Sequence, residues 1–75
     1  MSAVEEATYR AEQAILRTLK NYPNITRSML SVHLRPTYKN WTDALKELIE
    51  RGEVIQETVV RDTNRAVVIY HLPEY

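Results

Sequence analysis

Apolar residues recur at spacings of three and four along the first part of the chain, which is the period of one face of an α-helix. The stripe comprises Val4, Ala7, Ala11, Ala14, Ile15, Leu19 and Tyr22. Glu5 and Glu6 suit the positive end of the helix dipole, and Pro23 disfavours helical geometry in the residue before it. The pattern predicts a helix over residues 2–21. We interpret its stripe as core, the alternative being a dimer interface, since Ala permits close helix approach.

A second, shorter helix is predicted over residues 27–34. Thr26 is a good N-cap at its start, and Pro36 ends it. Its expected apolar side consists of Met29, Leu30, Val32 and Leu34. A helix of this length is not stable alone, so it must pack against its neighbours.

The third predicted helix covers residues 38–51, with Thr37 or Asn40 as its cap. Its apolar stripe is Trp41, Ala44, Leu45, Leu48 and Ile49. Lys46–Glu50 and Glu47–Arg51 are expected ion pairs on its solvent side, one helical turn apart. Gly52 is the only Gly in the chain, and it follows the helix where a left-handed residue commonly ends one.

The last third of the chain favours strands over residues 53–60 and 66–72, because it is rich in Val, Ile, Thr and Tyr. Residues 61–65 between them include Asp and Asn, which form turns, so we predict a β-hairpin. Its expected inward positions are Ile55, Val59, Val68, Tyr70 and Leu72. Together the elements predict a single α+β domain over residues 1–75, with three helices followed by a two-stranded hairpin.

The composition narrows the functional classes. The 75 residues include no Cys, and ten basic residues balance ten acidic ones. His33 and His71 lie far apart, without the further convergent ligands that a metal site needs. We therefore expect no enzyme, cofactor or metal. No apolar run approaches the roughly 18–20 residues of a membrane span, and the N-terminus does not read as a signal peptide, so we expect a cytoplasmic protein without membrane contact.

One stretch carries a family resemblance. DALKELIERGEVI, residues 43–55, followed by a hairpin ending in VIYHL, resembles the recognition helix and wing of winged-helix transcription regulators. The resemblance covers nearly the whole chain and implies a winged-helix fold. Trp41 stands where that family commonly has Val or Ile. We interpret Trp41 as a large core residue, the alternative being an exposed aromatic at a partner or nucleic-acid surface.

The winged-helix resemblance also implies double-stranded DNA as the partner, with the third helix in the major groove. Expected contacts from that helix and the turn before it are Tyr38, Lys39, Asn40, Thr42 and Lys46. Asn and Lys side chains can read base edges. The second helix and its turn would meet the phosphate backbone through Arg27, Ser28 and Arg35, and the hairpin loop through Arg61, Asn64 and Arg65.

The preferred interpretation is therefore a sequence-specific transcriptional regulator. A module this small makes few contacts, so we expect a homodimer on a palindromic site. Zero net charge keeps a second class open, because nucleic-acid binders usually carry a basic surplus. That alternative is a protein–protein adaptor on the same scaffold, in a replication or transcription assembly.

Overall fold

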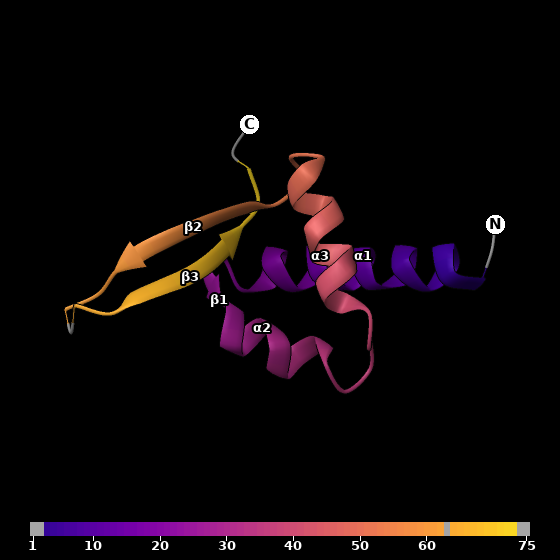
Figure 1. Cartoon of the computed structure of the whole chain (residues 1–75), viewed down its shortest axis with the longest axis horizontal. Helices are drawn as coiled ribbons and strands as arrows, with labels where there is room; N and C mark the ends of the chain where they lie inside the picture. The colour runs from indigo at the N-terminus through magenta and orange to yellow at the C-terminus, as the bar shows by residue number, and fades with distance from the viewer. Residues whose placement is uncertain (1–2, 63, 74–75) are drawn as a thin grey trace.

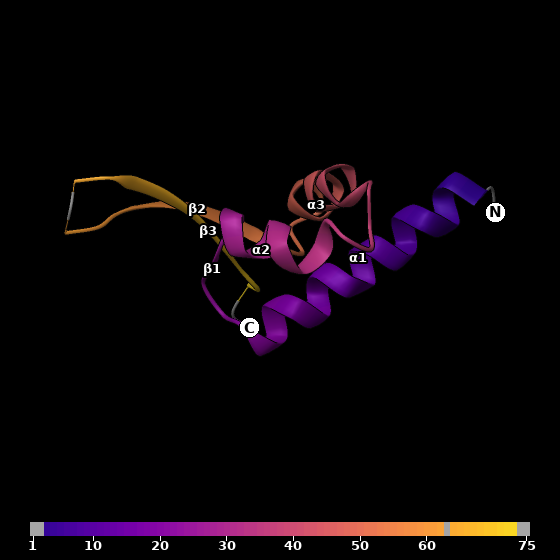
Figure 2. The same ribbon diagram turned by 90° about the horizontal axis from the view of Figure 1, so that it is seen from below.

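The computed structural model describes residues 3–62 and 64–73. Over these residues the chain forms a small α+β domain with three helices and a three-stranded antiparallel sheet (Figure 1). The elements are α1 (Ala3–Asn21), β1 (Ile25–Thr26), α2 (Arg27–Leu34), α3 (Trp41–Glu50), β2 (Ile55–Val60) and β3 (Ala66–His71). The three helices pack together at one end of the molecule, and the β2–β3 hairpin extends away from them (Figure 2).

Capping residues define the start of α2 and the end of α3. Thr26 caps α2, and its hydroxyl accepts a hydrogen bond of 3.3 Å from the Met29 amide. After the C-terminal end of α3, Gly52 has φ +75°. The Gly52 amide donates to the Ile49 carbonyl, and the next amide, from Glu53, donates to the Leu48 carbonyl. These two bonds form a Schellman motif, which satisfies the last helical carbonyls and turns the chain toward β2.

The start of α3 differs from the prediction. The helix begins at Trp41, three residues after the expected position 38. The Leu34 carbonyl accepts bonds from the Thr37 and Tyr38 amides, so a tight turn occupies the residues after Pro36. Asn40 precedes the helix, but its side chain makes no capping bond. Asn40 therefore occupies the N-cap position, as one of the two expected candidates, but its side chain does not cap the helix.

The two-residue strand β1 was not predicted. It pairs with β3, with Ile25 opposite Tyr70 and Thr26 opposite Ile69, and the sheet order is β1-β3-β2. Two residues are too few to show the alternation by which strands are recognised in sequence. This short pairing ties the base of the hairpin to the chain between α1 and α2.

The register of the hairpin corrects the expected inward face. Val68 lies opposite Thr58, whereas Ile55 and Val59 lie opposite His71 and Val67. Directly paired residues share a face of the sheet, so Ile55 and Val59 lie on the face opposite to Val68 and Tyr70. β3 is apolar at nearly every position, so its sequence did not indicate which alternate set faces the helices.

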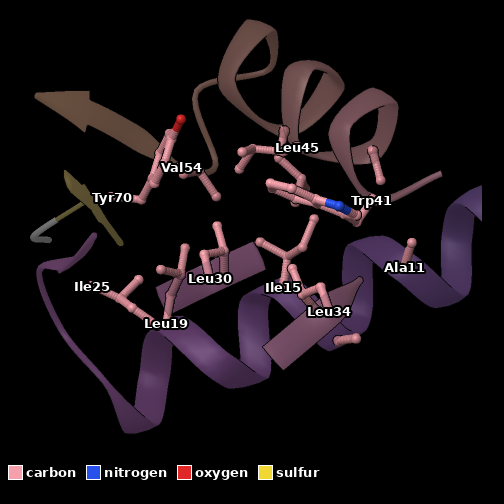
Figure 3. Close-up of a cluster of buried hydrophobic side chains, with 13 residues drawn as sticks. Ala11, Ile15, Leu19, Ile25, Leu30, Leu34, Trp41, Leu45, Val54 and Tyr70 are labelled. Atoms are coloured by element: carbon pink, nitrogen blue, oxygen red, sulfur yellow. The ribbon is translucent and has the colours of Figure 1, made fainter. Parts of the chain in front are cut away.

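The core lies where the three helices meet the base of the hairpin (Figure 3). Its buried members are Ala11, Ala14, Ile15, Leu19, Ile25, Leu30, Leu34, Trp41, Ala44, Leu45, Leu48, Val54 and Tyr70. Trp41 is only 7% exposed and packs within this cluster, which confirms its interpretation as a core residue. Val54, which lies outside the expected inward set, is 1% exposed.

Several predicted core positions lie at the surface instead. Met29 is 51% and Val32 65% exposed, because α2 spans only eight residues and buries Leu30 and Leu34, one turn apart. Tyr22 is exposed and stacks on His33, with 5.0 Å between ring centroids. The side chain of Val4 lies outside the described part of the structure.

Candidate nucleic-acid interface

Arg27, the first residue of α2, is held by side chains from two other elements. One of its guanidinium nitrogens, Nη1, donates a 2.8 Å hydrogen bond to the Tyr70 hydroxyl on β3. The guanidinium carbon lies 5.5 Å from the ring centroid of Trp41 on α3, a distance at which a cation is attracted to the aromatic face. Arg27 is nevertheless exposed. Its charge is therefore fixed in position while it remains accessible to a partner.

A shallow groove of about 460 Å³ runs from Arg27 to the hairpin. It is lined by Thr26, Arg27, Ser28, Arg65, Ala66, Val67 and Val68. The two charged residues in this lining are both arginines, one at the start of α2 and one immediately before β3. Two cations that are 38 positions apart in sequence thus share one concave surface.

A second groove, of about 500 Å³, leads from Arg27 onto the exposed side of α3. It is lined by Arg27, Thr42, Asp43, Leu45, Lys46, Ile49, Glu50 and Gln56. Thr42 and Lys46 are one helical turn apart and therefore lie on the same side of α3. Asp43 and Glu50 moderate the positive charge of this groove.

Because Arg27 lines both grooves, they form one continuous surface across α2, α3 and the hairpin. We define the Arg27 surface as Arg27, Ser28, Thr42, Lys46 and Arg65. All five residues were predicted as DNA contacts. The sequence did not reveal that Arg27 joins the two halves, because its partners Trp41 and Tyr70 lie 14 and 43 positions away.

Three other predicted contacts do not belong to this surface. Tyr38, Lys39 and Asn40 line a separate groove against the N-terminal half of α1. The Asn40 side-chain amide donates to the Thr8 hydroxyl at 3.2 Å, so it is turned toward α1. The turn that carries these residues follows the C-terminal end of α2, whereas Arg27 begins that helix. Lys39 and Arg65 therefore line different grooves.

The remaining predicted contacts, Arg35, Arg61 and Asn64, are exposed and line none of these grooves. Arg35 is the C-cap of α2. In the hairpin loop, the Asn64 amide donates to the Arg61 carbonyl at 2.9 Å. Asn64 has φ 58°, a left-handed conformation that Asn adopts more readily than most residues. Turn geometry is thus sufficient to explain Asn at this position.

Acidic residues gather in another groove, between α1 and the end of α3, which is lined by Glu5, Thr8, Tyr9, Glu12, Glu47 and Arg51. Glu12 is only 5% exposed, and Arg51 binds it at 2.9 Å and Glu53 at 2.7 Å. Arg51 was expected to pair with Glu47. The pKa of Glu47 is raised above its ordinary value. The larger cause is a hydrogen bond with Glu12, and the second is desolvation of the carboxyl group.

Within the described part of the chain, no group of three or more His, Cys, Asp or Glu residues is arranged to hold a metal ion. None of the helices that the described residues form is both long enough and apolar enough to cross a membrane.

Comparisons with protein-family models, with curated proteins and with solved structures find no match to this chain.

Proposed function

We propose that this protein binds double-stranded DNA as a small winged-helix transcriptional regulator. The order of elements supports this fold: three helices, a tight turn between the second and third, and a hairpin after the third. In this arrangement α3 is the helix that enters the major groove, and the β2–β3 hairpin is the wing. Its loop lies at the far end of the molecule from the N-terminus of α1 (Figure 1), so it can reach along a duplex.

The observation that carries the proposal is the Arg27 surface. It gathers three cations, Arg27, Lys46 and Arg65, from α2, α3 and the hairpin. Phosphate contacts by Lys and Arg supply most of the sequence-independent affinity for DNA. Because Arg27 is already held by Tyr70 and Trp41, it would lose little side-chain freedom when a phosphate binds.

The members of the Arg27 surface divide into two roles. Arg27, Ser28 and Arg65 lie beside the start of α2 and the hairpin, where they can donate to phosphate oxygens and fix the orientation of the duplex. Thr42 and Lys46 lie on the exposed side of α3. There Thr can touch a thymine methyl group, and Lys can reach a guanine acceptor in a specific site or a phosphate on a random-sequence duplex. Asp43, between them, can accept a hydrogen bond from cytosine.

The distribution of charge reconciles this role with a net charge of zero. Glu5, Glu12 and Glu47 line the groove between α1 and α3, which shares no lining residue with the grooves of the Arg27 surface. A duplex bound at the Arg27 surface would therefore meet Asp43 and Glu50 as the acids among the lining residues. We expect modest affinity that depends strongly on ionic strength.

A salt titration tests the proposal. Binding of a labelled random-sequence duplex is measured by fluorescence anisotropy at increasing salt concentrations. If Arg27, Lys46 and Arg65 each neutralise one phosphate, the logarithm of the binding constant should fall with the logarithm of salt with a slope of about −3. A protein–protein adaptor would show no affinity for the duplex even at low salt, and that result would reject the proposal.

A further inference from the structure

The groove that holds Tyr38, Lys39 and Asn40 is larger than either groove beside Arg27, at about 760 Å³. One wall is the N-terminal half of α1 and the other is the turn after α2. Its lining comprises Ala3, Ala7, Arg10, Thr37, Tyr38, Lys39 and Asn40. It therefore combines small apolar side chains and a half-buried tyrosine with two cations.

The helix that forms one wall of this groove projects beyond the rest of the domain. Ala11 and Ile15 of α1 are fully buried in the core, whereas Ala7 and Ala3, about one and two turns before Ala11, are exposed. Figures 1 and 2 show the first turns of α1 extending past α3. The apolar side of these turns therefore faces the turn after α2 on one side of the groove and is otherwise open to a partner.

Acidic and basic residues lie close together on this projecting part of α1. Glu6 is exposed and binds Arg10, one turn later, at 2.8 Å. Arg10 lines the groove, and Lys39 lies on the opposite wall. If a second α1 ran antiparallel to the first, the order of Glu6 and Arg10 along it would be reversed. Each Glu6 would then approach the cations of the other copy.

We propose that this groove is the interface of a homodimer, in which the N-terminal half of α1 from each copy occupies the groove of the other about a two-fold axis near Ala7. A two-fold interface uses the same patch twice and must be self-complementary. This patch is self-complementary in two respects. Its alanines let two helices approach closely, and its acid meets the partner's cations. None of its lining residues belongs to the Arg27 surface, so the inference does not rest on DNA binding.

The interface is built from short side chains and exposed ion pairs, which contribute little individually. Its area is therefore expected at the low end for specific complexes, and dimerisation should depend on protein concentration. Sedimentation velocity of the wild-type protein over a concentration series, without DNA, should show monomer passing into dimer. A wild-type protein that stays monomeric throughout the series would overturn the proposal.

Charge reversal provides a sharper test. Lys39→Glu places an acid opposite the partner's Glu6, and Glu6→Lys places a cation opposite the partner's Lys39. Each variant alone should dimerise at least tenfold more weakly than the wild type. In an equimolar mixture, one half of the heterodimer has both charges reversed and the other half is native, so dimer should return. Failure of the mixture to dimerise more strongly than either variant alone would contradict this pairing.

The absence of Cys from the sequence allows a covalent test that does not depend on affinity. Ala7→Cys should form a disulfide-linked dimer on oxidation, because residues near a two-fold axis can approach within the roughly 4.4–6.8 Å between Cα atoms that a disulfide requires. Gln13→Cys is the matched control, since Gln13 is exposed on the same helix and outside the groove. Equal crosslinking of the two variants would reject the interface, and selective crosslinking at position 7 would support it.

Discussion

Arg27 and Tyr70 are joined by a 2.8 Å hydrogen bond between the guanidinium group and the phenolic hydroxyl, although they lie 43 positions apart. Arg27 begins α2, and Tyr70 is a fully buried residue of β3 that packs in the core. The bond thus connects the helical half of the domain to the hairpin at the centre of the proposed DNA surface. It also gives the buried tyrosine hydroxyl a partner, as buried polar groups require.

Replacing Tyr70 with Phe should remove this bond while leaving the ring in the core. We expect a loss of about 1 kcal/mol in the free energy of unfolding, measured by urea denaturation. Affinity for duplex DNA should also fall, because Arg27 becomes freer and loses more side-chain entropy on binding. The matched control is Tyr22→Phe, since Tyr22 is exposed and stacks on His33 away from the Arg27 surface. Equal effects of the two changes would contradict the role of the bond.

Trp41 is expected to be the most costly single truncation in the domain. It packs in the core while its ring lies beneath Arg27. Trp41→Ala should destabilise the fold by about 3–5 kcal/mol, the usual cost of truncating a buried large aromatic residue. Trp41→Phe should cost less because it fills more of the space. Thermal unfolding of both variants, followed by circular dichroism, provides the measurement, and a change of less than 1 kcal/mol for Trp41→Ala would be incompatible with the observed packing.

Gly52 should be sensitive to substitution for a conformational reason alone. Its φ is +75°, and a Cβ atom added there would meet no heavy atom within 4 Å. Gly52→Ala should therefore destabilise the protein by about 1–2 kcal/mol, the cost of a left-handed conformation in a residue with a Cβ. Gly52→Asn should cost less, since Asn tolerates this conformation better. If the two variants were equally stable in chemical denaturation, the conformational explanation would fail.

Glu47 should make folding stability depend on pH. Its pKa in the folded protein is raised above 4.5, chiefly by the hydrogen bond with Glu12, so the folded state binds protons more tightly than the unfolded state. Stability from protonated Glu47 is therefore fully present below the unfolded pKa and is lost as pH rises through the folded pKa. Glu47→Gln removes this dependence.

The Glu47→Gln variant should gain unfolding free energy relative to the wild type as the pH rises from below 4.5. The gain should level off once the pH exceeds the folded pKa of Glu47. Urea denaturation at a series of pH values measures it. Asp43→Asn is a suitable control, because Asp43 is an exposed acid on the same helix and is not among the groups that raise the pKa of Glu47. A difference that stays constant with pH would show that the two carboxyl groups do not interact in solution.

Local chemistry explains which parts of the fold were predictable. Thr26, Pro36 and Gly52 act within a few residues of their own positions, so the extent of α2 and the end of α3 could be read from the sequence. The spacing of the α3 stripe likewise identified Trp41, correctly, as a core residue. Each of these inferences requires only the geometry of one helix and its caps.

The features that were missed depend on contacts between distant segments. Strand β1 exists because Ile25 and Thr26 pair with β3. A segment of two residues is too short for this pairing to be recognised from the sequence. The hairpin register is hidden by the apolar sequence of β3. Asn40 was assigned to DNA from its residue type, but the structure turns it toward Thr8 on α1. The junction of the two cationic grooves at Arg27 likewise requires the position of Tyr70.

The most direct test of the DNA-binding account compares two pairs of substitutions in the same anisotropy assay. Lys46→Ala with Arg65→Ala removes two cations from the Arg27 surface. Arg10→Ala with Lys39→Ala instead removes two cations from the groove between α1 and the turn after α2. The first variant should bind duplex DNA more weakly, with a salt slope reduced by about 2. The second should keep the wild-type slope and, at protein concentrations where the wild type is monomeric, its affinity. Equal losses of slope in the two variants would contradict the assignment of DNA to the Arg27 surface.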